Sequence, residues 1–246
     1  MPYPTYPYSL PHLSTEQMIA VDRAMIEDYH IQLIQMMENA GRNLAELARQ
    51  RFLNGNAANK RALILAGTGG NGGGALVCAR HLQNMGAEVY IAVSKPTVSF
   101  SGVPAHQLDI LRHLGLPVQI GIAENDFPQL DLIVDGIIGY SLQGDPRGTA
   151  AQIIAFANDH AAPTLSLDIP SGLDSTTGTP YTPTIHAAAT MTLALPKIGL
   201  QSKNAAPYVG ELFLADISVP FQLYKHVLDL DVPADLFSQS SIIRLT

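Results

Sequence analysis

The sequence predicts an α/β protein with a mostly parallel sheet, on two observations. Short, continuously apolar runs recur along the chain, and the intervals between the first of them are long enough to hold helices. Strands buried on both faces appear as continuous apolar runs, whereas half-exposed strands alternate between apolar and polar residues. A series of βαβ units follows from this order.

Two helices are expected before any strand. Ser14 and Gln17 have the spacing of a capping box, and the apolar residues that follow have helical spacing. This pattern predicts a first helix over 15–29. A second helical pattern runs from 34 to 51 and ends at the Asn-Gly-Asn sequence around Gly55.

The predicted sheet and its crossover helices follow. Strands are expected at 62–67, 87–93, 117–121, 131–139 and 163–172, and helices at 76–85, 106–114 and 149–160. Two later apolar runs, 188–196 and 210–218, have no long helix between them. They therefore predict an antiparallel pair at the edge of the sheet. From Phe221 onward we expect a weak helix and an irregular end.

Composition places the chain among globular proteins and excludes several function classes. Hydrophobic residues make up 47% and charged residues 14%, which excludes a disordered chain or a coiled coil. A net charge of −7 without a basic run disfavours nucleic acid. No apolar run is long enough for a membrane span, and the absence of a targeting signal at the N-terminus predicts a cytoplasmic protein. We expect a Pro- and Tyr-rich arm over 1–13 and a single domain over 14–246.

A glycine-rich segment follows the first predicted strand. Residues 67–74 hold six of the 20 glycines of the chain and lead into a helix. Such a turn lets backbone N–H groups approach an anion closely, with the positive end of the helix dipole directed at it. Gly67, Gly69 and Gly72 also satisfy G-x-G-x-x-G, which keeps an NAD(P)-dependent oxidoreductase open. The acidic residue expected after the second strand is missing, because Ser94 follows that strand.

Two aspartates end neighbouring apolar strands of the predicted sheet. Asp135 and Asp168 occupy positions where a carboxylate is costly unless it is hydrogen-bonded, binds a cation or acts as an acid or base. An aspartate at a strand end also often caps the next turn. Two of them beside the glycine-rich segment favour a functional site at the carboxyl edge of the sheet.

Five motifs in a fixed order resemble the YjeF N-terminal domain family. They are MMENAGR at 36–42, GTGGNGGGALVCAR at 67–80, VDGIIGYSLQG at 134–144, LDIPSGLDSTTG at 167–178 and TMTLALPK at 190–197. The resemblance runs from about residue 14 to about residue 220. It implies a three-layer α/β/α Rossmann-like sandwich, with two N-terminal helices before a mostly parallel sheet.

The resemblance also implies an activity and its site residues. Enzymatic members of this family are NAD(P)HX epimerases, which interconvert the R and S forms of hydrated NADH and NADPH. The family's substrate contacts correspond here to Gly70, Asn71, Gly72, Gly73, Gly74, Gly139, Tyr140, Ser141, Leu142, Gln143, Gly144, Asp145 and Asp168. Asp168 is the candidate catalytic acid and base.

A potassium ion is the implied cofactor. The family's ligands correspond to Asn71, Asp135 and Ser171, which offer the amide, carboxylate and hydroxyl oxygens that K⁺ prefers. The family's substrate loop usually is N-N-G-G-D, so this chain departs from it at Gly70 and Gly74. The missing aspartate at position 74 removes a polar group from this loop.

Some members of this family are not enzymes. A non-catalytic nucleotide-binding or scaffolding module is therefore a second hypothesis, and hydride transfer by an oxidoreductase is a third. Retention of Asn71, Asp135, Asp168 and Ser171 together favours the epimerase. From the resemblance we also expect a homodimer, and a separate NAD(P)HX dehydratase as the pathway partner.

Overall fold

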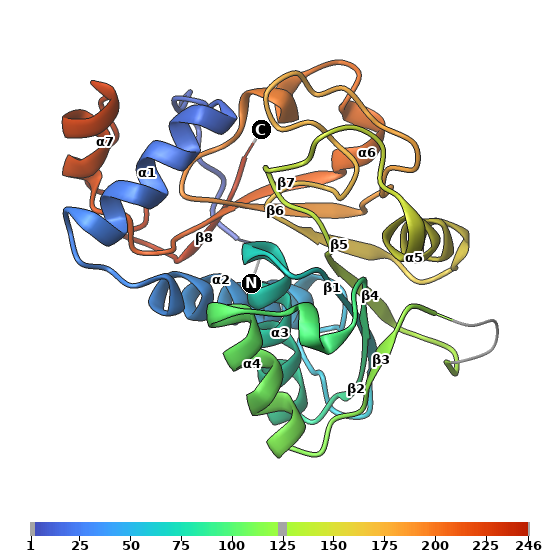
Figure 1. Ribbon diagram of the computed structural model, residues 1–246. Helices are drawn as coiled ribbons and strands as arrows, with labels where there is room; N and C mark the ends of the chain where they lie inside the picture. Colours follow the sequence, from blue (N-terminus) through green and yellow to red (C-terminus); the bar gives the residue numbers. More distant parts are fainter. Residues whose placement is uncertain (1–2, 123–126, 246) are drawn as a thin grey trace.

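The computed structural model describes residues 3–122 and 127–245, and its centre is one eight-stranded sheet (Figure 1). The strand order is β3-β2-β1-β4-β5-β6-β7-β8. The strands are β1 (Arg61–Ala66), β2 (Glu88–Val93), β3 (Val118–Ile120), β4 (Leu132–Gly136), β5 (Thr164–Leu167), β6 (Ala189–Leu193), β7 (Glu211–Ala215) and β8 (Ile242–Arg244). The helices are α1 (Thr15–Glu27), α2 (Leu33–Arg51), α3 (Gly70–Asn84), α4 (Gly102–His113), α5 (Gly148–Asp159), α6 (Ala206–Val209) and α7 (Phe221–Leu228).

The order of strands creates a topological switch point at the carboxyl edge of the sheet. β1 lies between β2 and β4, and both pairings are parallel. The chain therefore continues from β1 toward one side of the sheet and from β4 toward the other. Ligands of open α/β sheets bind at such a switch point. Gly67 after β1 and Gly136 at the end of β4 meet there, with the Gly67 N–H donating to the Gly136 carbonyl at 3.0 Å.

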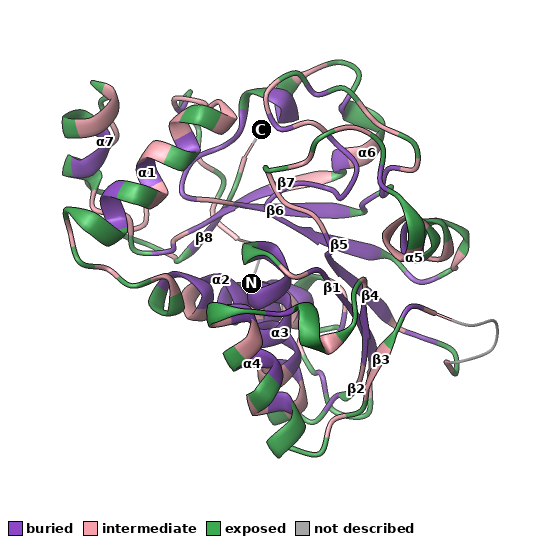
Figure 2. Cartoon of the chain, viewed as in Figure 1, coloured by how far each residue is buried: buried purple, intermediate pink, exposed green. Residues whose placement is uncertain are grey.

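Helices cover both faces of the sheet, as the alternation of side chains along β1 requires. Ile64 belongs to a core cluster with residues of α2, α3 and α4, whereas Leu63 and Leu65 pack with Ile153 and Ile154 of α5. Figure 2 shows the strands buried between these helices. The predicted three-layer α/β/α sandwich is confirmed.

One prediction about the sheet is wrong. β6 and β7 pair in parallel and not as an antiparallel edge. The short helices 198–201 and 206–209 in the connection suffice to return the chain to the start of β7. The antiparallel pair is β7 with β8, a strand in the tail that the sequence predicted to be irregular. Three residues are too short to produce a readable apolar pattern.

The N-terminal arm and α1 cover the β8 end of the sheet. The Tyr6 N–H donates to the Arg244 carbonyl, and the Arg244 N–H donates to the Pro4 carbonyl, both at 2.9 Å. The arm thus satisfies backbone groups of an edge strand. Ser14 and Gln17 form the predicted capping box at the start of α1. Within the described ranges, no helix is both long and apolar enough to cross a membrane.

Helix α3 begins earlier than predicted. It starts at Gly70, inside the glycine-rich segment, instead of near residue 76. Glycine lowers helix propensity, which explains the prediction, but tertiary packing decides the structure here. Cys78 of α3 is fully buried, and burial raises the pKa of its thiol, so it is not a nucleophile.

Candidate active site

The glycines of α3 serve two purposes. A Cβ atom at Gly72 would lie 1.8 Å from the Gly67 carbonyl oxygen, and one at Gly74 would lie 2.7 Å from the Leu167 side chain. These glycines let α3 pack closely against the sheet. At Gly69 a Cβ would meet nothing within 4 Å, and at Gly70 only a methyl group 3.9 Å away. The start of the helix therefore remains open to a ligand.

The open start of α3 is a candidate anion site. Gly69 and Gly70 are exposed, and the first amides of a helix have no partner within it. The Gly73 N–H is already used, since it donates to the Gly69 carbonyl at 3.0 Å. The remaining amides and the helix dipole favour a phosphate group at this position.

Asn71 joins this helix to the two neighbouring parts of the site. Its side-chain amide donates to the carbonyl of Leu167, at the end of β5, over 2.7 Å. On the other side, a Cβ at Gly139 would lie 2.7 Å from the Asn71 Oδ1 atom, so position 139 requires glycine. Asn71, within the predicted segment 70–74, therefore contacts the first residue of segment 139–145 and Leu167, the residue before Asp168.

Asp135 is fully buried and surrounded by neutral donors. One carboxylate oxygen accepts from the Ser171 hydroxyl at 2.6 Å and the Ile137 N–H at 3.2 Å. The other accepts from the Ser166 hydroxyl at 2.8 Å and the Ser171 N–H at 2.9 Å. Burial raises the pKa of Asp135, and these hydrogen bonds oppose that rise. No salt bridge to Asp135 occurs in the described part of the chain.

Asp168 is 2% exposed and forms an ion pair with Lys197, whose exposure is 0%. The same carboxylate oxygen, Oδ1, accepts from the Thr192 hydroxyl at 3.3 Å and the Leu193 N–H at 3.2 Å. Lys197 also donates to the Leu193 carbonyl at 2.8 Å. No described residue donates to Oδ2, so this oxygen remains available for a ligand.

The backbone of this edge adopts an uncommon conformation at three neighbouring strand ends. Asp168 after β5 has φ 65°, Ala194 after β6 has φ 63°, and Ser218 beyond β7 has φ 66°. Non-glycine residues rarely adopt positive φ, and such residues cluster at functional sites. For Asp168 this conformation brings Oδ1 to the backbone N–H of Leu193.

The predicted substrate segment 139–145 is held at both ends. The Tyr140 hydroxyl donates to a carboxylate oxygen of Asp22 on α1 at 2.5 Å. Asp145 accepts from the Thr182 N–H at 2.9 Å, so its carboxylate supports a neighbouring loop. The residues between them are partly or fully open to solvent: Ser141 and Gln143 are exposed, and Leu142 and Gly144 are half-buried.

Lys197, Thr192 and Asp22 are site residues that the sequence reasoning missed. A lysine next to a continuously apolar run was a usable signal for Lys197, because a buried lysine needs a counter-charge. Thr192 and Asp22 carried no such signal. Asp22 lies between the buried Val21 and exposed Arg23 of an amphipathic helix, where an acidic residue is ordinary.

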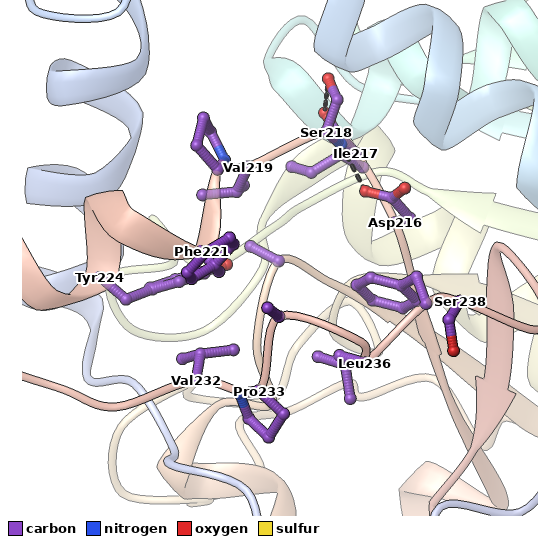
Figure 3. A pocket seen from close by; sticks show the side chains of 14 residues that line it. Asp216, Ile217, Ser218, Val219, Phe221, Tyr224, Val232, Pro233, Leu236 and Ser238 are labelled. Carbon is purple, nitrogen blue, oxygen red and sulfur yellow. Dashed lines mark hydrogen bonds between the residues drawn. The ribbon is translucent and has the colours of Figure 1, made fainter.

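A cavity of about 390 Å³ opens near this edge, beyond β6 and β7. Figure 3 shows Phe221 and Tyr224 of α7 on one side of it, with Val232, Pro233 and Leu236 opposite. Ala194 also lines the cavity, but none of the predicted substrate or metal residues does.

A parallel sheet with a switch point and polar groups gathered at its carboxyl edge defines a Rossmann-like α/β protein. The chain matches the family described as YjeF-related protein N-terminus over residues 33–199. It belongs to that family, as its five motifs predicted.

Individual relatives are similar in sequence over most of this chain. An NAD(P)H-hydrate epimerase of Rhodopirellula baltica is 34% identical, covering 88% of both chains. One of Dehalogenimonas lykanthroporepellens is 39% identical, covering 83% of this chain and 80% of the relative. The bifunctional NAD(P)H-hydrate repair enzyme Nnr of Moorella thermoacetica is 36% identical over 86% of this chain and 41% of its own length. The fold is similar to that of yeast ynu0, YNL200c, with a TM-score of 0.75 at 23% identity, covering 96% and 100% of the two chains.

Proposed function

We propose that this protein is an NAD(P)H-hydrate epimerase, an isomerase that interconverts the R and S forms of hydrated NADH and NADPH. The observation that carries the proposal is the buried Asp168–Lys197 pair, in which one carboxylate oxygen accepts no hydrogen bond from a described residue. Asp168 directly follows Leu167, whose carbonyl accepts from Asn71 in the first turn of α3. The names of the relatives support the same activity.

Two parts of the site suit two parts of the substrate. The protein carries a net charge of −7, so a pyrophosphate requires neutral backbone donors, which the first turn of α3 offers. Segment 139–145 lies on the other side of Asn71 and supplies exposed polar side chains. We assign substrate contacts to residues 70–74, residues 139–145 and Asp168.

The chemistry needs one group that gives and takes a proton. The hydrated carbon bears a hydroxyl group and is bonded to the ring nitrogen. Protonation of the hydroxyl lets water leave as the nitrogen lone pair forms a planar C=N⁺ cation, and water then attacks either face. Asp168 is ionised in its pair with Lys197, so a turnover begins when its free oxygen takes up a proton from solvent. The protonated Asp168 gives this proton to the leaving hydroxyl and later takes one from the attacking water, which restores the acid. Lys197 stabilises the carboxylate that exists between these two steps.

The oxygen-bearing side chains at and around Asp135 suit a potassium ion. This carboxylate is fully buried and bonded only to neutral groups, so its charge lacks a protein counter-charge among the described residues. Asn71, Asp135 and Ser171 would hold the ion through amide, carboxylate and hydroxyl oxygens. The ion would supply positive charge that fixes the ends of β4 and β5.

The remaining parts of the proposal concern assembly and setting. We expect a homodimer that works in the cytoplasm, with an NAD(P)HX dehydratase acting on the S form. The bifunctional name of the Moorella relative supports this pairing of activities.

The direct test is conversion of enriched R-NADPHX to the S form, followed by chromatography with and without K⁺. We expect conversion well above the spontaneous rate of a protein-free sample, and faster in K⁺. A rate equal to the spontaneous one would contradict the proposal and favour a scaffolding module. Oxidation of NADPH or reduction of NADP⁺ would favour an oxidoreductase.

A further inference from the structure

Helix α1 reaches the proposed site through one side chain. Asp22 is half-buried and accepts the Tyr140 hydroxyl at 2.5 Å, which is the short distance of a charge-assisted bond. Tyr140 stands at the start of the segment assigned to substrate. This contact joins residues 118 positions apart in the chain, so α1 holds a segment that its own strand, β4, does not fix.

The first turn of α1 is bonded to the same region. The Thr15 hydroxyl lies 2.6 Å from the Ser175 hydroxyl, and the Thr15 N–H donates to Thr176 at 3.0 Å. Ser175 in turn donates to the Tyr140 carbonyl at 3.2 Å. Tyr140 is therefore held at its backbone from one end of α1 and at its hydroxyl by the middle of α1.

Asp22 also belongs to the electrostatic surroundings of the catalytic pair. Burial raises its pKa, the Tyr140 hydrogen bond and the charge of Lys197 oppose that rise, and Asp168 adds to it. Asp22 and Asp168 thus both lie near the buried ammonium group of Lys197. On the α7 side, burial raises the pKa of Tyr224, and the charges of Asp216 and Asp22 add to that rise.

We propose that Asp22 is a positioning residue for the substrate, acting through the hydroxyl of Tyr140 to fix segment 139–145 against the site. The inference rests on the proposed function, because it assumes that this segment contacts the dinucleotide. It assigns α1 a role in binding and not only in covering the sheet. Because this segment is already ordered before the substrate arrives, less conformational entropy is lost on binding.

Kinetics on R-NADPHX test this role with four variants. We expect Asp22→Ala and Tyr140→Phe each to raise KM about tenfold, with kcat changed less than twofold. Asp22→Asn keeps an acceptor without the charge and should raise KM less. Asp22→Ala/Tyr140→Phe should be no worse than the larger single change, because both remove the same bond. Asp28→Ala, an exposed aspartate just after the same helix, is the matched control and should leave KM unchanged.

Two further readouts separate this role from simple support of the fold. Loss of stability alone would lower the thermal midpoint and the active fraction, and hence the apparent kcat, without raising KM. Calorimetric titration with NADP⁺ should show the same loss of affinity as KM. Suppose that the wild-type protein is active. An unchanged KM in Asp22→Ala, or additive effects on KM in the double variant, would then overturn the inference about Asp22 but not the proposed function. Wild-type protein that neither converts R-NADPHX nor binds NADP⁺ would overturn the proposed function and the inference together.

Discussion

Asp135 and Asp168 are the same residue type at the ends of two adjacent strands, yet their surroundings differ. Asp135 receives four hydrogen bonds from neutral groups, spread over both oxygens. Asp168 concentrates its partners on one oxygen, and one of them is the ammonium group of Lys197. A carboxylate with both oxygens occupied suits a fixed anchor, whereas one with a free oxygen suits chemistry on a ligand.

Removal of the acid–base group should produce the largest effect. Asp168→Asn alone leaves an unpaired buried ammonium, so we prefer Asp168→Asn/Lys197→Met, which replaces the pair by neutral groups. We expect kcat for R-NADPHX to fall by about 10² to 10⁴, with a thermal midpoint close to that of the wild type. A double variant that folds and retains wild-type kcat would show that Asp168 is not the acid and base of the reaction.

Breaking the ion pair from one side should produce the largest loss of stability. Lys197→Met leaves Asp168 buried without its counter-charge and should lower the free energy of unfolding by about 3–5 kcal/mol. Most of that loss should return in Asp168→Asn/Lys197→Met, as urea unfolding would show. Lys203→Met changes an exposed lysine in the same way and should have little effect. If Lys197→Met and Lys203→Met lowered the free energy of unfolding equally, the Asp168–Lys197 ion pair would not contribute to stability.

The response of thermal stability to potassium should depend on Asp135 and not on Asp168. Exchange of K⁺ for a bulky organic cation should lower the thermal midpoint of the wild type by about 2–4 °C for each kcal/mol of lost binding energy. This response should vanish in Asp135→Asn and persist in Asp168→Asn/Lys197→Met. A K⁺ response that follows Asp168 instead would reverse the assignment.

The smallest effect concerns Asp22, the carboxylate that α1 contributes near this edge. Burial raises its pKa above the usual 3.8, so the folded protein holds this proton more tightly than the unfolded chain. Its contribution to stability is therefore complete below pH 3.8 and is lost as pH rises through the raised value. Asp22→Asn lacks this term, so the wild type should lose stability relative to the variant on going from pH 4 to pH 7. Urea unfolding across this range, beside Asp28→Asn, would detect it; a parallel response of all three proteins would contradict it.

The sequence predicted the sheet better than the contacts within the site. Continuous apolar runs identified β1 to β5, because parallel strands are buried on both faces. They could not distinguish a parallel from an antiparallel β6–β7 pair, since that depends on how a short connection crosses the sheet. The glycines from 67 to 74 indicated an anion site, but not that Gly72 and Gly74 also permit close packing.

Candidate site residues could be proposed from the sequence where a local pattern marked them. Asp135 and Asp168 stand at strand ends, where position alone indicates a role. Lys197 and Asp22 are hydrogen-bonded to partners 29 and 118 residues away, and no local pattern carries such a pairing. Only the folded chain shows that Asp168 has an ammonium partner and a free oxygen.

The fate of the substrate's hydroxyl oxygen tests the role of Asp168 most directly. Epimerisation of R-NADPHX in H₂¹⁸O, followed by mass spectrometry and corrected for the protein-free rate, reports whether that oxygen leaves. If Asp168 protonates a departing hydroxyl and then activates water, the S product carries one ¹⁸O atom, and labelling fails in Asp168→Asn/Lys197→Met. An S product formed at the enzymatic rate with its original oxygen would contradict the account.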